Sequence, residues 1–221
     1  MNEGIFTFGF VMIGWVFSTC VHEFSHAYVA YMGGDHSVKD KGYLSLNPLA
    51  YADPVYSVVI PVAILLMGGI ALPGAAVYIR TSALRGRGWR AAVSIAGPAS
   101  NAVLALIAVA VLRFVPPEES MLRSALALLI HLEVVAVALC MIPVPPLDGY
   151  GVIEPFLTPA FRNEIAPMHR WGMWAVILTL FYIAPVSARF WAGIQHATNA
   201  LGVDPALIRE AWGNFHFWKG R

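Results

Sequence analysis

The chain has 221 residues, of which 58% are hydrophobic and 12% are charged, and its formal net charge is +1. Soluble domains usually carry about twice this charged fraction, so the composition excludes an ordinary soluble domain and favours a protein surrounded by lipid. The low net charge offers no dense basic patch, which argues against nucleic acid as a partner.

Apolar stretches recur along the chain and determine the predicted fold. Each can be compared with the roughly 17 to 25 residues that cross a bilayer as a helix. We expect an all-α, polytopic, multi-pass integral membrane protein. It would form one domain over residues 1–221, with about five to six transmembrane helices, a short membrane-surface strand or loop region and a re-entrant loop. Stretches without Asp, Glu, Lys or Arg cover residues 4–21, 54–79, 91–112 and 171–188, and residues 124–142 carry only Glu133.

The first helix is predicted from about Gly4 to Met32, with the motif HEFSH in its last two turns and the pair Gly33-Gly34 at its end. A polar stretch follows. Its segment GYLSLNPL alternates apolar and polar side chains before Asn47-Pro48. This pattern is typical of a short strand or an interfacial turn, and we expect it at the membrane surface.

The second apolar stretch contains prolines and glycines that a straight helix would not tolerate. We expect a helix over residues 55–67 and then a re-entrant or cavity-lining loop with the sequence GGIALPG. Irregular backbone at membrane depth persists only where protein or a water-filled cavity satisfies its polar groups.

Three further spans complete the predicted fold. The third begins near Ala91 and contains AGPASN, the fourth ends at Met141, and the fifth covers residues 171–191. The tail, residues 197–221, is expected to lie at the membrane interface, because aromatic side chains beside basic ones are typical of an interfacial anchor. The aromatic residues concerned are Trp212, Phe215, Phe217 and Trp218.

The motif HEFSH carries the clearest chemical signal. On a helix, His22 and His26 lie one turn apart on one face, where both imidazoles can bind a single Zn²⁺. Glu23 lies about 100° further around the helix, within reach of an attacking water as its general base. Ionisable side chains in a lipid-compatible helix are costly and usually indicate function. The alternative is a turn of polar residues at the membrane surface.

A catalytic zinc site normally has three protein ligands and an open position. Asp148, in PVPPLDGYG, is the best candidate for the third ligand, because the preceding prolines break the helix and Gly149 frees the turn after the ligand. The alternative is a loop aspartate that caps the next helix, and the spacing alone does not separate the two interpretations.

Several motifs occur together and in a fixed order: HEFSH, GYLSLNPL with a following Asp53-Pro54, AGPASN, and PVPPLDG. With them the chain resembles the site-2 protease family of intramembrane zinc metalloproteases, in a short form without a PDZ domain. The resemblance covers roughly residues 10–155.

The resemblance implies one zinc ion per chain bound by His22, His26 and Asp148, with Glu23 activating the water. It also implies that Asn101 of AGPASN lies close to the site, where its amide would stabilise the oxyanion or hold the substrate strand. Taken by itself, Asn101 is more typical of a polar residue that packs between helices.

Two residues depart from the family pattern on the fourth span. Glu133 and Cys140 stand where the family usually has Asn, which leaves an Asn-mediated substrate clamp in doubt. Glu133, with His131 nearby, would tune the site, gate water or relay protons; the alternative is a buried residue in a hydrogen-bonded pair.

The resulting hypothesis is a zinc-dependent intramembrane metalloendopeptidase that acts in regulated intramembrane proteolysis. Its expected partners are a transmembrane protein substrate, the lipid bilayer and regulatory membrane proteins. Its expected location is a bacterial or archaeal cytoplasmic membrane. Two alternatives stay open: a membrane metal transporter with His22, Glu23, His26 and Glu133 along its path, and a catalytically inactive relative that binds membrane segments.

Overall fold

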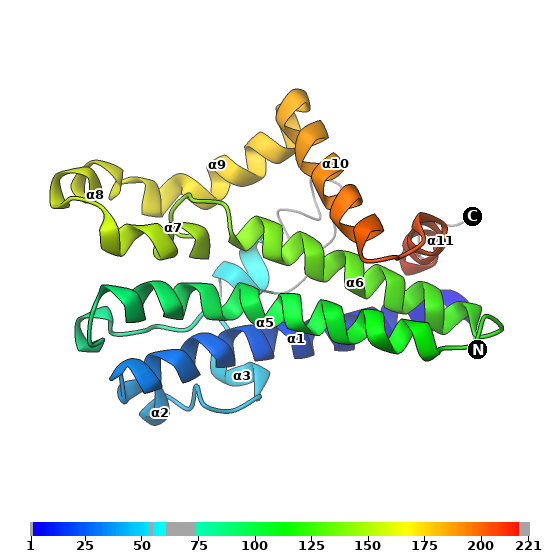
Figure 1. Ribbon diagram of the computed structural model, residues 1–221, viewed down its shortest axis with the longest axis horizontal. Coiled ribbons are helices and arrows are strands. Elements are labelled where there is room, and N and C mark those ends of the chain that lie inside the picture. The colour runs from blue at the N-terminus through cyan, green and yellow to red at the C-terminus, as the bar shows by residue number, and fades with distance from the viewer. Residues whose placement is uncertain (1, 54, 61–73, 217–221) are drawn as a thin grey trace.

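Long helices dominate the fold, as the apolar stretches predict (Figure 1). The computed structural model describes the chain except residues 1, 54, 61–73 and 217–221. Within the described part there is no strand. The elements in chain order are α1 (Glu3–Gly33), α2 (Ser37–Asp40), α3 (Pro48–Tyr51), the π-helical η1 (Val55–Val59), the 3-10 turn η2 (Thr81–Ala83), α5 (Arg87–Phe114), α6 (Ser120–Cys140), α7 (Asp148–Ile153), the 3-10 turn η3 (Glu154–Phe156), α8 (Pro159–Ile165), α9 (Met168–Tyr182), α10 (Ala184–Ala200) and α11 (Pro205–Phe215).

Helix α1 agrees with the predicted first helix to within a residue at each end. It begins after Asn2, whose side chain accepts a hydrogen bond of 2.9 Å from the backbone of Gly4. It ends because Gly34 adopts a left-handed conformation with φ of 119°, which only glycine reaches at little cost. Its 31 residues span about 46 Å, more than the roughly 30 Å of a hydrocarbon core.

Helices α1, α5 and α6 run side by side and form the body of the molecule (Figure 1). All three are long and apolar enough to cross a membrane, and α5 and α6 correspond to the third and fourth predicted spans. The chain reverses between α5 and α6 within residues 115–119, where the Arg123 guanidinium donates a hydrogen bond of 2.6 Å to the carbonyl of Val115. The three helices therefore supply a packed frame for the site.

The predicted fifth span is not one straight helix. It is divided into α9 and α10, which meet at an angle of 90° at Ile183 (Figure 1). Pro185 occupies the first turn of α10, where it needs no hydrogen-bond partner. With the bent pair counted as one span, the described residues contain four candidate spans. The expected five to six spans are not found among them.

The expectations for the second apolar stretch fall mostly outside the described residues. Of the predicted helix over residues 55–67, the structure describes the π-helical turn η1, and only Gly74 of the predicted loop GGIALPG is described. In GYLSLNPL, the strand interpretation is wrong and the turn interpretation holds. Bends lead to Asn47, whose side chain caps the short helix α3 by accepting a hydrogen bond of 3.1 Å from Leu49.

The end of the chain packs on the bundle. Helix α11 lies against α1 and α6, and Phe215 is 2% exposed, with its ring centroid 5.1 Å from that of Phe8. This corrects the expectation that Phe215 belongs to an interfacial anchor, because its ring contributes to the apolar core instead. Trp212 is 38% exposed, and Phe217 and Trp218 lie outside the described residues.

Candidate metal centre

The metal centre lies where α1 packs on α5, and each helix contributes residues that follow one another at intervals of four or eight positions. Ser18, His22 and His26 lie along one face of α1, and Asn101 of α5 contacts the first two of them. Eight residues earlier in α5, the carbonyl of Val93 contacts His26. Residues four apart share a helix face, and the order of contacts shows that the helices run antiparallel. The packing of α1 on α5 thus places the imidazoles of His22 and His26 side by side between the two helices.

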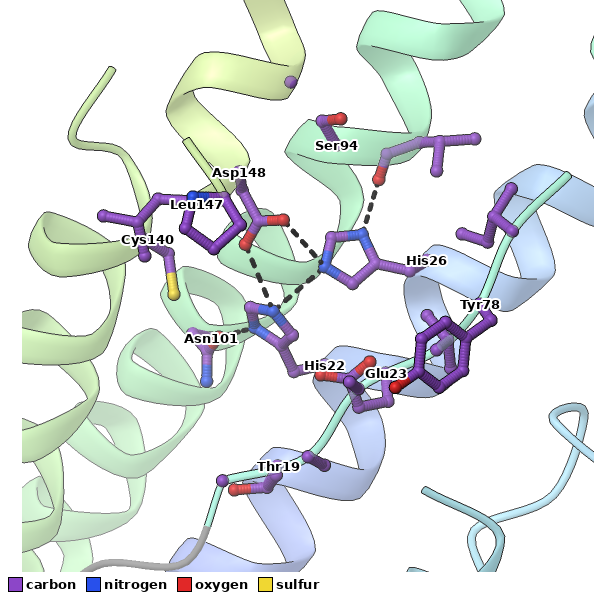
Figure 2. A pocket seen from close by; sticks show the side chains of 18 of the residues that line it. Thr19, His22, Glu23, His26, Tyr78, Ser94, Asn101, Cys140, Leu147 and Asp148 are labelled. Atoms are coloured by element: carbon purple, nitrogen blue, oxygen red, sulfur yellow. Dashed lines mark hydrogen bonds and ion pairs between the residues drawn. The ribbon is translucent and has the colours of Figure 1, made fainter. Parts of the chain in front are cut away.

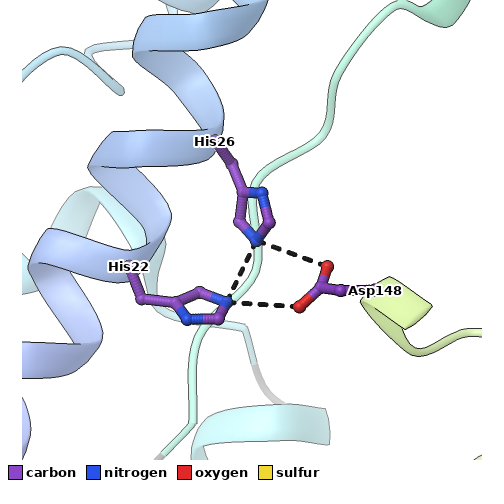
Figure 3. Close-up of side chains that lie close together, drawn as sticks. All are labelled: His22, His26 and Asp148. Atoms are coloured by element: carbon purple, nitrogen blue, oxygen red, sulfur yellow. Dashed lines mark hydrogen bonds and ion pairs between the residues drawn. The ribbon is translucent and has the colours of Figure 1, made fainter. Parts of the chain in front are cut away.

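The third side chain arrives from a distant part of the chain (Figure 3). Nε2 of His22 lies 3.4 Å from one Asp148 carboxylate oxygen, Nε2 of His26 lies 3.3 Å from the other, and the two Nε2 atoms are 3.0 Å apart. Zn–N and Zn–O bonds of about 2.0–2.1 Å in a tetrahedron separate ligand atoms by about 3.3 Å. Two imidazole nitrogens and a carboxylate oxygen at this spacing suit zinc. Within the described chain, this is the one group of three or more such ligands.

Hydrogen bonds on the far side of each ring set the orientation of both imidazoles. His26 Nδ1 donates to the carbonyl of Val93 at 2.6 Å, and His22 Nδ1 donates to Oδ1 of Asn101. A proton on Nδ1 leaves the lone pair on Nε2, the atom that faces Asp148. Two such lone pairs and a carboxylate directed at one point repel each other unless a cation lies between them, so the arrangement fits a metal ion.

The proline-rich segment after α6 carries Asp148 to this point. Asp148 is the first residue of α7, Leu147 occupies the N-cap position, and no side chain caps this helix. The carboxylate therefore does not cap the helix; it contacts the imidazoles. Burial raises the pKa of Asp148, but its contacts with the imidazoles of His22 and His26 outweigh burial and hold the pKa well below its usual range. The group remains an anionic ligand.

Gly149 allows this turn to form, for a reason other than the predicted one. Its backbone does not need a positive φ. A Cβ at Gly149 would lie 2.2 Å from the carbonyl oxygen of Met141 and 2.7 Å from that of Ile142. The glycine thus lets α7 pack directly on the backbone that ends α6, which brings Asp148 back to the helix bundle.

Glu23 lines the same cavity, which has a volume of about 500 Å³ (Figure 2). Its side chain is 7% exposed, and the backbone of Val77 provides it with a hydrogen bond. Cys140 and Asn101 line the cavity too. A carboxylate beside three converging ligands, in a cavity that can hold a peptide segment, has the arrangement expected of a general base.

A segment without helix or strand, residues 74–80, forms another wall of the cavity. Its backbone donates hydrogen bonds to α3 and to a residue just beyond the end of α1. Ala76 donates to the carbonyl of Tyr51 at 3.1 Å, and the amide of Arg80 donates to Asp35 at 2.7 Å. Asp35, just beyond the end of α1, also accepts hydrogen bonds from the Ser37 amide and hydroxyl. The buried Asp35 carboxylate therefore connects the end of α1 to this wall.

The substitution Asp35→Asn is expected to destabilise the fold by about 1.5 to 3 kcal/mol at pH 7, the range for hydrogen bonds to a charged group. Burial raises the pKa of Asp35, but the hydrogen bonds from Ser37 and Arg80 lower it further, to below its ordinary value. The stabilisation is therefore present above about pH 4 and is lost as the pH falls through the folded-state pKa. Thermal unfolding of both proteins in detergent, from pH 7 to pH 3, measures this. The exposed control Asp40→Asn should show no such pH-dependent difference, and a difference that grows towards acid pH would contradict the assignment.

Gly97 lies directly against the two imidazoles. A Cβ at this position would meet Nε2 of His26 at 2.3 Å and Nε2 of His22 at 2.5 Å, which is much closer than van der Waals contact. Gly97→Ala is expected to displace both rings and to weaken zinc affinity at least about 10-fold, as misplaced ligands do. Zinc competition with a chelator measures the loss. The matched control on the same helix is Gly88→Ala, since a Cβ at Gly88 meets nothing within 4 Å. Equal zinc affinities for the two variants would contradict the prediction.

The structure places His22, Glu23, His26, Asp148 and Asn101 around one cavity, while their roles stay predictions. The Asn101 amide nitrogen, however, donates to Ser18 at 2.8 Å and to Glu133 at 2.7 Å. Its contacts are thus those of a residue that holds His22, while its role towards an oxyanion remains a prediction. Glu133 does not pair with His131, which contacts Thr198 at 3.3 Å.

Sequence reasoning missed two contributors. Ser18 precedes His22 by four residues and so shares its helix face, a spacing that could have identified it. The carbonyl of Val93 could not have been identified in this way, because every residue carries such a group and only packing selects one of them.

Comparisons with known proteins agree with the geometry. No protein-family model matches the chain, and no solved structure matches it. The chain is 40% identical over 210 residues to "Putative zinc metalloprotease Rip2" of Mycolicibacterium smegmatis, a match that covers 94% of this chain and 80% of that protein. The protein of the same name from Mycobacterium tuberculosis strain H37Rv is 38% identical, over 93% of this chain and 82% of the relative. "Putative zinc metalloprotease YwhC" of Bacillus subtilis is 30% identical, over 81% of this chain and 82% of the relative. On this similarity, which extends over most of both partners in each pair, the chain belongs to the site-2 protease family of zinc metalloproteases.

Proposed function

We propose that the protein is a zinc-dependent intramembrane metalloendopeptidase that hydrolyses a peptide bond in or near the transmembrane segment of another protein. One observation carries the proposal: His22, His26 and Asp148 converge at 3.0–3.4 Å with Glu23 in the same cavity, among helices long and apolar enough to cross a membrane. The names of the relatives, which call them zinc metalloproteases, support the chemistry.

His22, His26 and Asp148 would hold the zinc ion, which when bound polarises the scissile carbonyl and lowers the pKa of water. Glu23 accepts the proton of the attacking water and passes it to the leaving amine. The hydrogen bonds of His22 to Asn101 and of His26 to Val93 keep the two rings in place during both proton transfers. The buried position of Glu23 keeps bulk water away from the reacting carboxylate.

A transmembrane helix hides its carbonyls in hydrogen bonds from residue i to residue i−4, so the substrate must unwind locally before attack. Residues 74–80 form neither helix nor strand beside Glu23, and backbone outside regular structure can pair with a peptide strand by main-chain hydrogen bonds. We place the unwound substrate segment along this wall of the cavity. Regulatory membrane proteins, or prior trimming of the substrate, would control its access.

The proposal is tested with purified protein in liposomes that also contain a library of single-span reporter proteins. We expect stoichiometric zinc, cleavage within or beside the reporter spans as read by mass spectrometry, loss of cleavage on treatment with a chelator, and recovery with added Zn²⁺. The same liposomes test the metal-transporter alternative. Zinc flux without cleavage would favour a transporter and would contradict the proposal, and stable zinc binding with neither activity would favour a catalytically inactive relative.

A further inference from the structure

Glu133 is a carboxylate inside an apolar helix, and the mechanism above does not use it. It lies in the second half of α6 and is 2% exposed. Among the described residues no Lys or Arg forms an ion pair with it. A carboxylate within a transmembrane segment costs several kcal/mol, so it is retained there for a functional reason more often than for packing.

The contacts of Glu133 lead directly to the metal centre. Its Oε2 accepts a hydrogen bond of 2.7 Å from Nδ2 of Asn101, and the same amide nitrogen donates to Ser18 Oγ at 2.8 Å. The oxygen of that amide accepts the Nδ1 proton of His22. Figure 2 shows Asn101 directed at the His22 ring, whose other nitrogen faces Asp148. Carboxylate, amide and imidazole therefore form one chain of hydrogen bonds that ends at a zinc ligand.

The chemistry of an amide fixes which group donates and which accepts in this chain of hydrogen bonds. One end of the Asn101 side chain only donates and the other only accepts, whereas a carboxylate accepts at both oxygens. If the amide were turned by 180°, its oxygen would face the Glu133 oxygen and its N–H groups would face the N–H of His22. Both contacts would then be repulsive. A carboxylate at position 133 thus permits one orientation of the amide, the orientation that places the His22 proton on Nδ1.

We infer that Glu133 is a positioning residue for the zinc site: acting through Asn101, it fixes the tautomer and orientation of His22 so that Nε2 faces His26 and Asp148. This inference rests on the proposed zinc-protease function and adds a residue to it. It also accounts for the departure at this position, because the Asn that the family resemblance leads one to expect could present either end of its amide to Asn101. The carboxylate removes that ambiguity.

The test compares zinc affinities of purified variants by competition with a chelator, a measurement that does not depend on any substrate. Glu133→Met removes the acceptor and keeps the volume, and it is expected to weaken zinc affinity by about 10-fold to 100-fold, the usual cost of losing an outer partner of a metal ligand. Glu133→Gln keeps an acceptor oxygen but can also turn its N–H groups towards Asn101, so its zinc affinity is expected to lie between those of Glu133→Met and the wild type. Leu132→Met, the adjacent buried position on α6, is the matched control and should bind zinc like the wild type.

Three further readouts separate positioning from structural support. Glu133→Met leaves the buried Asn101 amide without one acceptor, so the metal-free variant should melt somewhat lower than the wild type but remain folded. In an Asn101→Leu background, Glu133→Met should have no further effect on zinc affinity, because Glu133 acts on His22 only through Asn101. The ¹⁵N spectrum of the His22 ring in metal-free protein should show one tautomer in the wild type and a mixture in Glu133→Met.

Each result decides the inference. A Glu133→Met protein that remains folded with wild-type zinc affinity would overturn it, as would a single His22 tautomer in that variant or additive losses in the double variant. These outcomes differ from failure of the proposed function, in which the wild-type protein itself would bind no zinc or would cleave no reporter.

Discussion

Replacing Glu23 with Gln is expected to leave zinc binding intact and to lower the rate of cleavage by about 10²-fold to 10⁴-fold, the usual contribution of a general acid–base. The Glu23 carboxylate lines the cavity that the three ligands face, but it is not among the atoms that converge on one point. The amide is nearly the same size, so the fold and the ligands should be unchanged. It cannot accept the proton of the attacking water.

The measurement pairs zinc content with the initial rate of reporter cleavage in liposomes. The control is Glu118→Gln, the same chemical change at an exposed residue between α5 and α6, which should behave like the wild type in both assays. A Glu23→Gln protein that retains its zinc and cleaves at the wild-type rate would show that another group is the base.

Removal of the third ligand is expected to have the second large effect. Asp148→Ala should weaken zinc affinity by more than the roughly 10-fold to 100-fold that loss of an outer partner costs, and cleavage should become undetectable. Two imidazoles alone leave the site with too few protein ligands. Asp148→Asn keeps an oxygen but loses the negative charge, so its zinc affinity should lie between those of Asp148→Ala and the wild type.

Zinc competition and cleavage are measured on the same preparations, with the exposed residue Asp40 replaced by Ala as the control. Tight zinc binding by Asp148→Ala would mean that the protein completes the site with a different ligand.

Much of the helical framework could be predicted from composition. The ends of α1 agree with prediction because they depend on local chemistry, namely the Asn2 cap and the left-handed Gly34. The break between α9 and α10 was not predicted. Pro185 is compatible with the first turn of a new helix and with a kink in a continuous one, and packing against the neighbouring helices decides between them.

The placement of His22, Glu23 and His26 was determined by the sequence, because a helix with 3.6 residues per turn brings residues i and i+4 to one face whatever surrounds them. The position of Asp148, the choice of the Val93 carbonyl, and the orientation of the Asn101 amide between Glu133 and His22 were decided only by the tertiary structure. These contacts join parts of the chain far apart in sequence. Their geometry depends on how closely Gly97 and Gly149 let backbones approach and on which hydrogen-bond partners packing leaves within reach, and neither is encoded in a local pattern.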